Sequence, residues 1–218
     1  MIVYTAIFGG YDKPLKPNFA GSCPHVLFTD HEMEAPGWEV RVVAREFGNP
    51  ARENRYYKMH PHKLFPKKRT IYHDGGMRLN MYPVDILKRF QVMAGGDHSV
   101  FTLKHSLGHT MRQEFEWVRR KGIVLPSVLD EQWARYEVEG APFDDPVAEA
   151  RLLVSRPDAS RFYGVWWEEV RQYAHRDQVS FAYARWRTKA DVCLIEEPNW
   201  RALFSHKPHR KTQLRGAI

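Results

Sequence analysis

Residues 2–12 read IVYTAIFGGYD, an apolar and β-rich run that stops at two glycines. A run of this kind, bounded by turn residues, predicts a strand over residues 2–8. Four further apolar runs predict strands at 25–30, 38–43, 69–74 and 192–195. Strands that are apolar nearly throughout are typical of a sheet covered by helices on both faces. The sequence therefore predicts an α/β fold.

Helical segments occur between these strands. The first is predicted from Asn49 and Pro50, because Asn is a good N-cap and proline suits the first turn. It ends near Met59, since Pro61 disfavours helix at the residue before it. Further helices are predicted over 82–92, 109–121, 127–138 and 161–176. No repeat or obvious linker interrupts the chain, so we expect one domain over residues 1–218.

Composition limits the possible classes of protein. The 218 residues are 43% hydrophobic and 27% charged, which excludes a wholly disordered chain. No apolar run approaches the roughly 20 residues of a membrane span, and the opening run has no basic leader. Two cysteines, Cys23 and Cys193, cannot form a disulfide framework, so we expect a cytoplasmic location. A formal net charge of +7 favours an anionic partner such as a phosphate, a nucleotide, nucleic acid or anionic lipid.

Polar and glycine residues follow four of the predicted strands. In open α/β sheets the ligand binds outside the carboxyl ends of the strands. The residues at these ends are Gly9-Gly10-Tyr11-Asp12, Thr29-Asp30, Ala44-Arg45 and His73-Asp74-Gly75-Gly76. Each piece alone is equally consistent with an ordinary turn. Asp74 is the most suggestive residue, because a carboxylate at a strand end can bind a metal or a ribose hydroxyl.

Other charged residues have two readings each. Arg52, Arg55 and Lys58 lie close together on the predicted helix 50–59, where they could grip a diphosphate or form a solvated face. Asp177 could orient an acceptor hydroxyl or cap a helix. His105 and His109, four residues apart, could share a metal or form a surface pair. These alternatives stay open from the residues alone.

Several motifs occur in an order that resembles a known family. They are YTAIFGGYD at 4–12, FTD at 28–30, YK at 57–58, PHKLFP at 61–66, IYHDG at 71–75, EQ at 131–132 with Tyr136, Gly140 and Pro142, WWEE at 166–169 and RDQVSF at 176–181. The chain resembles the glycosyltransferase-like domain found in many bacterial proteins and in plant Golgi proteins linked to turgor regulation and seed-mucilage pectin. The resemblance covers nearly the whole sequence.

The resemblance implies a GT-A-like fold, with a Rossmann-type mixed sheet flanked by helices. It implies a nucleotide-binding half near 1–100 and an acceptor-side half near 101–204, and a shift in composition toward His, Lys and Arg marks a basic tail at 205–218. The implied partners are a nucleotide-diphosphate sugar donor and a hydroxyl acceptor such as a glycan, as in polysaccharide synthesis. Neither nucleic acid nor a membrane span is expected.

The resemblance also implies a set of site residues. Donor binding falls to Phe8, Gly9, Gly10, Tyr11, Asp30, Arg52, Arg55, Lys58, His73, Asp74, Gly75 and Gln178. Asp74 takes the place of the first carboxylate of an Asp-x-Asp metal motif, but Gly76 stands at the second. A divalent cation, Mn or Mg, would then need His206 or His209 from the tail as a further ligand. Asp177 is the first candidate for the base and Glu169 the second.

One stretch departs from the family's pattern, and two other functions compete. Related sequences tend to have His-Pro-x-Arg ahead of a glutamate, whereas Ser106-Leu107-Gly108 follows His105 here, and Glu114 keeps its spacing. A basic nucleic-acid-binding protein would explain the charge, although no recognised module appears. A metal-dependent phosphoesterase would use Asp74 and the histidines.

Overall fold

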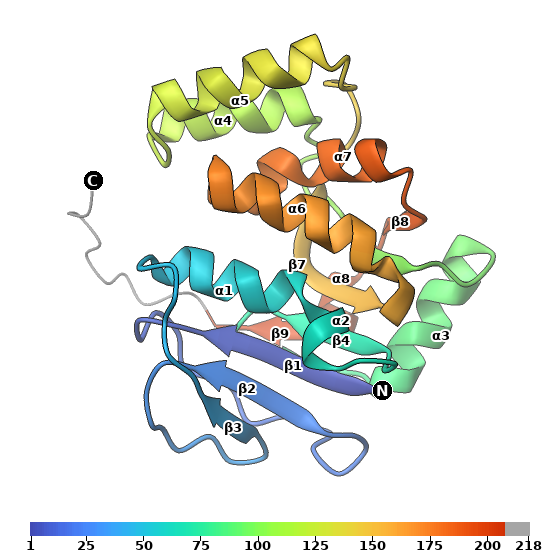
Figure 1. Ribbon diagram of the computed structural model, residues 1–218. Helices are drawn as coiled ribbons and strands as arrows, with labels where there is room; N and C mark the ends of the chain where they lie inside the picture. The colour runs from blue at the N-terminus through green and yellow to red at the C-terminus, as the bar shows by residue number, and fades with distance from the viewer. Residues whose placement is uncertain (208–218) are drawn as a thin grey trace.

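The computed structural model describes residues 1–207 and shows a seven-stranded sheet with helices on both faces (Figure 1). The strand order is β3-β2-β1-β4-β7-β6-β8, and among these strands only β7 runs antiparallel to its neighbours. The strands are β1 (Ile2–Ile7), β2 (His25–Thr29), β3 (Glu39–Val42), β4 (Thr70–His73), β6 (Val100–Lys104), β7 (Ala148–Ser155) and β8 (Val192–Ile195). This arrangement confirms the predicted α/β class with a mixed sheet.

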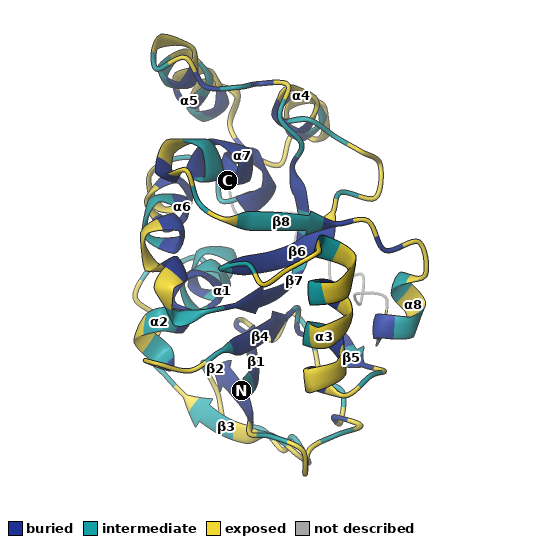
Figure 2. Cartoon of the chain, turned by 90° about the vertical axis from the view of Figure 1, so that its right-hand side faces the viewer, coloured by how far each residue is buried: buried dark blue, intermediate teal, exposed yellow. Residues whose placement is uncertain are grey.

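Two layers enclose the sheet, as the end-on view of Figure 2 shows. One face carries α1 (Pro50–Met59), α2 (Pro61–Leu64), a 3-10 turn (Pro157–Ala159), α6 (Ser160–Gln172) and α7 (Asp177–Thr188). The other carries α3 (Pro83–Ala94), α8 (Trp200–Leu203) and a small sheet of β5 (Met77–Leu79) and β9 (Phe204–His206). A hairpin of α4 (Met111–Lys121) and α5 (Pro126–Val138) packs outside α7.

Alternate side chains of β1 pack into two separate hydrophobic cores, one on each face of the sheet. Tyr4, Ala6 and Phe8 pack beneath α1 and α6, whereas Val3 packs toward α3 with Ile71 of β4. Successive side chains of a strand point to opposite faces, so an unbroken apolar strand requires cover on both. Burial of β1 therefore follows directly from the opening stretch of the sequence.

Most predicted elements are confirmed, and one is wrong in extent. The strands predicted at 2–8, 25–30, 38–43, 69–74 and 192–195 are present, as are the helices predicted at 50–59, 82–92, 109–121 and 127–138. The helix predicted over 161–176 instead ends at Gln172, because Tyr173 leaves the helical region at φ −120°, ψ −130°. Asp177 then opens a second helix, α7. The sequence reading missed β5, β6, β7 and β9.

The chain returns to the sheet near its end. β9 pairs antiparallel with β5, and the backbone N–H of Lys207 donates to the carbonyl of Gly76 at 2.9 Å. The start of the basic tail therefore lies against the loop that follows Asp74. His209, a predicted metal ligand, lies outside the described residues.

Within residues 1–207, no helix has the length and apolar character needed to cross a membrane. The compartment stays a prediction.

His73 gives the fold a testable pH dependence. Its ring is 1% exposed, packs edge-on to Trp38 and donates from Nδ1 to the carbonyl of Asp74 at 3.0 Å. Burial lowers the pKa of His73 to about 4, against a weaker opposing effect of that hydrogen bond. Between the unfolded value near 6.5 and about 4, the unfolded chain binds more protons than the folded one. The stability that the neutral His73 ring contributes to the fold is therefore complete above about pH 6.5, and it is lost as the pH falls toward 4.

Asn at position 73 keeps an N–H donor but cannot titrate. We therefore expect His73→Asn to lose about 2 kcal/mol less free energy of unfolding than wild type between pH 7 and pH 5. Urea unfolding at the two pH values measures the difference. His206→Asn is the control, since that residue is exposed. Equal pH slopes for wild type and His73→Asn would contradict the assignment.

Candidate functional site

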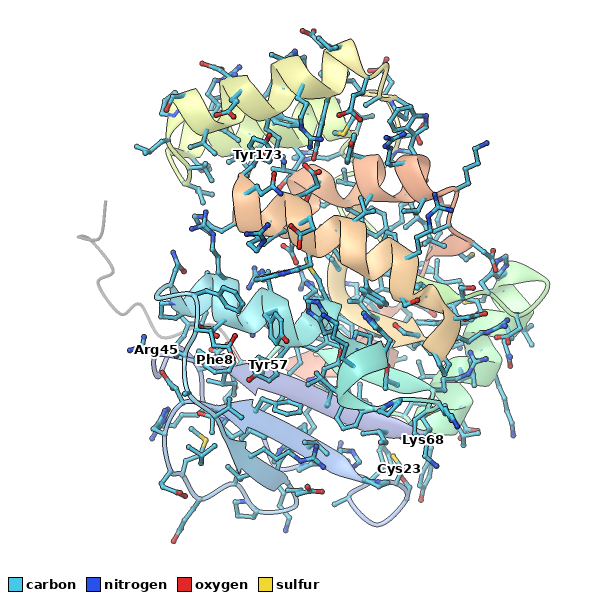
Figure 3. The ribbon with its side chains drawn as sticks, in the orientation of Figure 1. Phe8, Cys23, Arg45, Tyr57, Lys68 and Tyr173 are labelled. Carbon is cyan, nitrogen blue, oxygen red and sulfur yellow. The ribbon has the colours of Figure 1, made fainter. Side chains whose placement is uncertain are left out.

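The loop after β1 is held in place by a carboxylate at the end of β2. The backbone N–H of Gly9 donates to both oxygens of Asp30, at 3.2 and 3.0 Å, and Arg45 lies 3.4 Å from the same carboxylate. Gly9 adopts φ +64°, and a Cβ there would lie 2.8 Å from the ring of Pro50. Figure 3 shows Phe8, Arg45 and Tyr57 together at this edge of the sheet. Asp30 thus fixes the glycine loop against the start of α1.

The loop after β4 presses against the loop after β1. A Cβ on Gly75 would lie 2.5 Å from the side chain of Ile7, and one on Gly76 would lie 3.5 Å from a carboxylate oxygen of Asp12. Asp74 accepts a hydrogen bond from the Tyr72 hydroxyl at 3.1 Å. The close packing of glycine brings the carboxylates of Asp12 and Asp74 to the same edge. Sequence reasoning gave no role to Asp12, although it ends the quoted motif.

Three guanidinium groups, those of Arg55, Arg151 and Arg176, act electrostatically on this edge. Burial alone would lower the pKa of Arg55, but Asp177 and Asp74 outweigh burial and raise it. Burial lowers the pKa of Arg151, a shift that Asp74 opposes and Arg176 reinforces. The charges of Arg55 and Arg176 both act on the exposed Tyr11, whose pKa is raised chiefly by burial and by Asp12. Positive charge is therefore concentrated around Asp74 and Tyr11.

The predicted basic face of α1 is divided. Residues three apart on a helix are offset by about 60°, so Arg52, Arg55 and Lys58 fan over about 120°. Arg52 donates to the carbonyls of Val170 (3.4 Å) and Tyr173 (3.1 Å), which end α6. Lys58 is 2% exposed and pairs with a carboxylate of α7. Arg55 is the member of the three that reaches the edge.

Both predicted bases are buried and paired. Asp177 is 3% exposed and forms ion pairs with Lys58 and, at 3.6 Å, with Arg55. Burial would raise the pKa of Asp177, but Arg55, Lys58 and Arg176 hold it well below its usual range. Glu169 pairs with Arg135 on α5. As placed, both carboxylates connect helices.

Two predicted donor residues are also buried. Gln178 is 4% exposed and donates from Nε2 to the carbonyl of Ala148 at 2.9 Å, which positions the start of β7. His73 is enclosed by Trp38 and its own strand. Any part that these two residues play in binding would act through the neighbouring backbone.

Among residues 1–207, three potential metal ligands converge at His105, His109 and Glu114, with ligand atoms within 4.8 Å of one another. Nδ1 of His105 accepts from the backbone N–H groups of Leu107 (3.3 Å) and His109 (3.4 Å), so the proton of the neutral ring lies on Nε2. Glu114 is 1% exposed and accepts from His109 at 3.1 Å and from Arg176 at 3.2 Å. This pattern fits a hydrogen-bonded network that orients Arg176, and it leaves His105 no lone pair for a metal.

A cleft adjoins this cluster at the carboxyl ends of β6 and β8. Its volume is about 650 Å³. Aromatic, acidic and basic side chains line it, including His105, Glu149, Arg151, Glu196, Trp200 and Phe204. Arg151 therefore belongs both to the wall of the cleft and to the charged cluster around Asp74.

The model of the TOD1/MUCI70 glycosyltransferase-like domain matches residues 1–209. The chain belongs to this family. The match covers nearly the full length of the chain, so both the charged edge and the cleft lie within the matched domain. The resemblance read from the sequence motifs is thereby confirmed.

One curated relative is the probable hexosyltransferase MUCI70 of Arabidopsis thaliana, 25% identical over 252 residues. The match takes in all of this chain and 43% of the relative, so the chain spans less than half of that protein's length. Among solved structures, the apo structure of the bifunctional glycosyltransferase WbbM aligns with 89% of this chain and 38% of its own, at 9% identity and a TM-score of 0.49.

The buried pair between Lys58 and Asp177 gives a stability prediction. Asp177→Asn leaves Lys58 buried without a countercharge, and we expect a loss of about 3 kcal/mol in the free energy of unfolding. The double variant Lys58→Met with Asp177→Leu should recover part of that loss, because it removes the buried ammonium group together with its countercharge. Denaturant unfolding measures all three proteins, with Asp158→Asn as an exposed control. If Asp177→Asn were as stable as wild type, the ion pair between Lys58 and Asp177 would not be desolvated in the fold.

Proposed function

We propose that the chain is a glycosyltransferase that moves a sugar from a nucleotide-diphosphate donor to a hydroxyl acceptor on a glycan. The observation that carries the proposal is the contact between the two glycine loops, which gathers Asp12 and Asp74 among Arg55, Arg151 and Arg176. A leaving diphosphate gains negative charge in the transition state, and guanidinium groups fixed in advance stabilise that charge. Membership of a glycosyltransferase-like family supports the same reaction.

The first loop suits the nucleotide. Gly9 and Gly10 both have positive φ and let the backbone approach a ligand closely. Tyr11 follows them in the same loop and is 45% exposed. Phe8 is buried against Tyr57, with ring centroids 5.2 Å apart, and supports the loop from below. The GT-A-like assignment of the fold rests on this loop, the mixed sheet and the strand-end carboxylate together.

A divalent cation bound at this edge would be held by carboxylates. Asp12 and Asp74 would supply carboxylate oxygens, which Mn and Mg prefer as ligands. Asp12 would replace the second carboxylate of the Asp-x-Asp motif, a position at which this chain has Gly76. His206 ends β9 beside the same loop, and His209 would be the next candidate from the tail. The cation would supply positive charge to the diphosphate. Arg55, Arg151 and Arg176 orient the diphosphate.

Arg55 should recognise phosphate and not the nucleoside. We expect Arg55→Ala to weaken nucleoside diphosphate binding 10-fold or more and nucleoside binding less than 2-fold, since a hydrogen bond to a charged group contributes about 1.5–3 kcal/mol. Titration calorimetry with UDP, GDP and ADP, each against its nucleoside, measures the difference. Arg171→Ala is the control, because that side chain lies on the exposed side of α6. Equal losses for diphosphate and nucleoside would place Arg55 away from phosphate.

Asp74 should matter far more for turnover than for folding. Its carboxylate takes a hydrogen bond from Tyr72 that an amide oxygen can also accept. We therefore expect Asp74→Asn to unfold within about 1 kcal/mol of wild type and to release nucleoside diphosphate at least 100-fold more slowly. Release is measured with UDP-glucose, UDP-galactose and GDP-mannose, with and without manganese. Turnover at the wild-type rate would reject Asp74 as a donor or metal ligand.

A further inference from the structure

Strand β7 contains a large bulge where it passes the site. Lys104 pairs with Ala148 and Thr102 with Leu153, so two steps along β6 correspond to five along β7. The extra residues, 149–151, also lie just beyond the last β7 pair with β4, His73 with Leu152. Bulges of this kind bend a strand and redirect its side chains, and they are common beside active sites.

The bulge has a strained centre and two charged flanks. Ala150 is buried and adopts φ +52°, a left-handed conformation that costs an L-residue energy. Strain of this sort persists where the surrounding structure enforces it, and it is concentrated at functional sites. Glu149 and Arg151 form an ion pair, and both line the cleft. The strained turn therefore presents a carboxylate and a guanidinium to one space.

Glu149 is anchored and retains acceptor capacity. One oxygen accepts from the backbone N–H of Ser106 at 3.1 Å, and the other pairs with Arg151. Each carboxylate oxygen has two lone pairs, so both keep one for a further donor. The side chain is 11% exposed and lines the cleft. Arg151 in turn accepts, through its carbonyl, the N–H of Asp74 at 3.1 Å, which places Glu149 next to the donor edge.

The cleft suits a neutral, hydroxyl-rich ligand. Its other carboxylates are already neutralised, Glu196 by Lys104 and Glu197 by Arg89. Trp200 stacks on Phe204 at 5.2 Å and gives the wall an apolar patch. Paired charges with an apolar patch match a sugar chain, which combines hydroxyl groups with apolar ring faces. The volume of about 650 Å³ lies within the usual range for small-ligand sites.

We propose that this cleft binds the glycan acceptor and that Glu149 is the catalytic base of the transfer, an inference that rests on the proposed function. The acceptor oxygen forms a bond to the anomeric carbon while the bond from that carbon to the diphosphate oxygen breaks. The electron pair of the broken bond leaves with the diphosphate, toward Arg55 and Arg176. The hydroxyl proton passes to Glu149. A single displacement of this kind inverts the anomeric carbon.

Other carboxylates serve less well. Asp177 and Glu169 are buried in ion pairs among helices. The side chain of Glu197 is fully buried and held by Arg89 and by the backbone of Asn199. Glu149 alone among these four joins the cleft to the strand-end cluster, through the bulge it shares with Arg151.

The test compares Glu149→Gln with wild type, using Glu168→Gln on α6 as the matched control. UDP-glucose, UDP-galactose and GDP-mannose are the donors, and methyl glycosides and cello-, xylo- and galacto-oligosaccharides are the acceptor probes. Calorimetry gives donor affinity, and nucleotide release and NMR of the product give turnover and anomeric configuration. We expect donor Kd within 2-fold of wild type, turnover lowered 100-fold or more, and an inverted product.

Each outcome separates the two levels of the proposal. Wild-type turnover in Glu149→Gln, or a product of retained configuration, would overturn Glu149 as the base while leaving the transferase intact. Failure of the wild-type protein to bind or turn over any donor would overturn the proposed function and this inference together. Where Glu149→Gln does not fold, Glu149→Asp keeps the charge but withdraws it by one methylene, and full turnover in that variant would count against the base.

Discussion

The buried ion pair between Lys58 and Asp177 determines how the helical layer meets the sheet. Removing two charges from water is costly, and the cost is offset only where geometry and further hydrogen bonds are good. Here Asp177 opens α7, its backbone carbonyl accepts from the indole of Trp166 at 2.8 Å, and Arg55 lies 3.6 Å from its carboxylate. The pair thus fixes α1, α6 and α7 relative to one another. Arg176 directly precedes Asp177 in the chain and donates a hydrogen bond to Glu114. The ion pair and Glu114 together therefore set the position of Arg176.

The parts of the fold that the sequence predicted are those with uninterrupted local signals. The opening run over 2–8 is apolar throughout and ends in two glycines, so period, length and stop signal agree. β7 was missed because Glu149 and Arg151 interrupt its apolar pattern, and the bulge that exposes them depends on pairing with two distant strands. Residues 173–176, between α6 and α7, contain no glycine or proline, so no local signal predicts the break. Tyr173 nevertheless leaves the helical region, because tertiary contacts and not local sequence decide its conformation.

The candidate site, too, could be predicted only in part from the sequence. The positions at the strand ends, such as Gly9, Asp30 and Asp74, follow from the rule that parallel strands present their carboxyl ends to one edge. The roles of individual side chains did not follow. A carboxylate at position 177 looks available in the sequence, but its partner Lys58 is 119 positions away, and the pairing exists only in the folded chain. Asp12 shows the converse, since its closeness to Gly76 depends on two loops that meet only through glycine.

Arg151 links the two halves of the proposed reaction. In the described structure its guanidinium pairs with Glu149 while its charge also acts on Asp74 and Arg176. A diphosphate bound at the edge would add negative charge near Arg151, and a guanidinium can donate to both the diphosphate and Glu149 through its five N–H groups. The same side chain can therefore contact the leaving diphosphate and hold Glu149 beside the acceptor cleft.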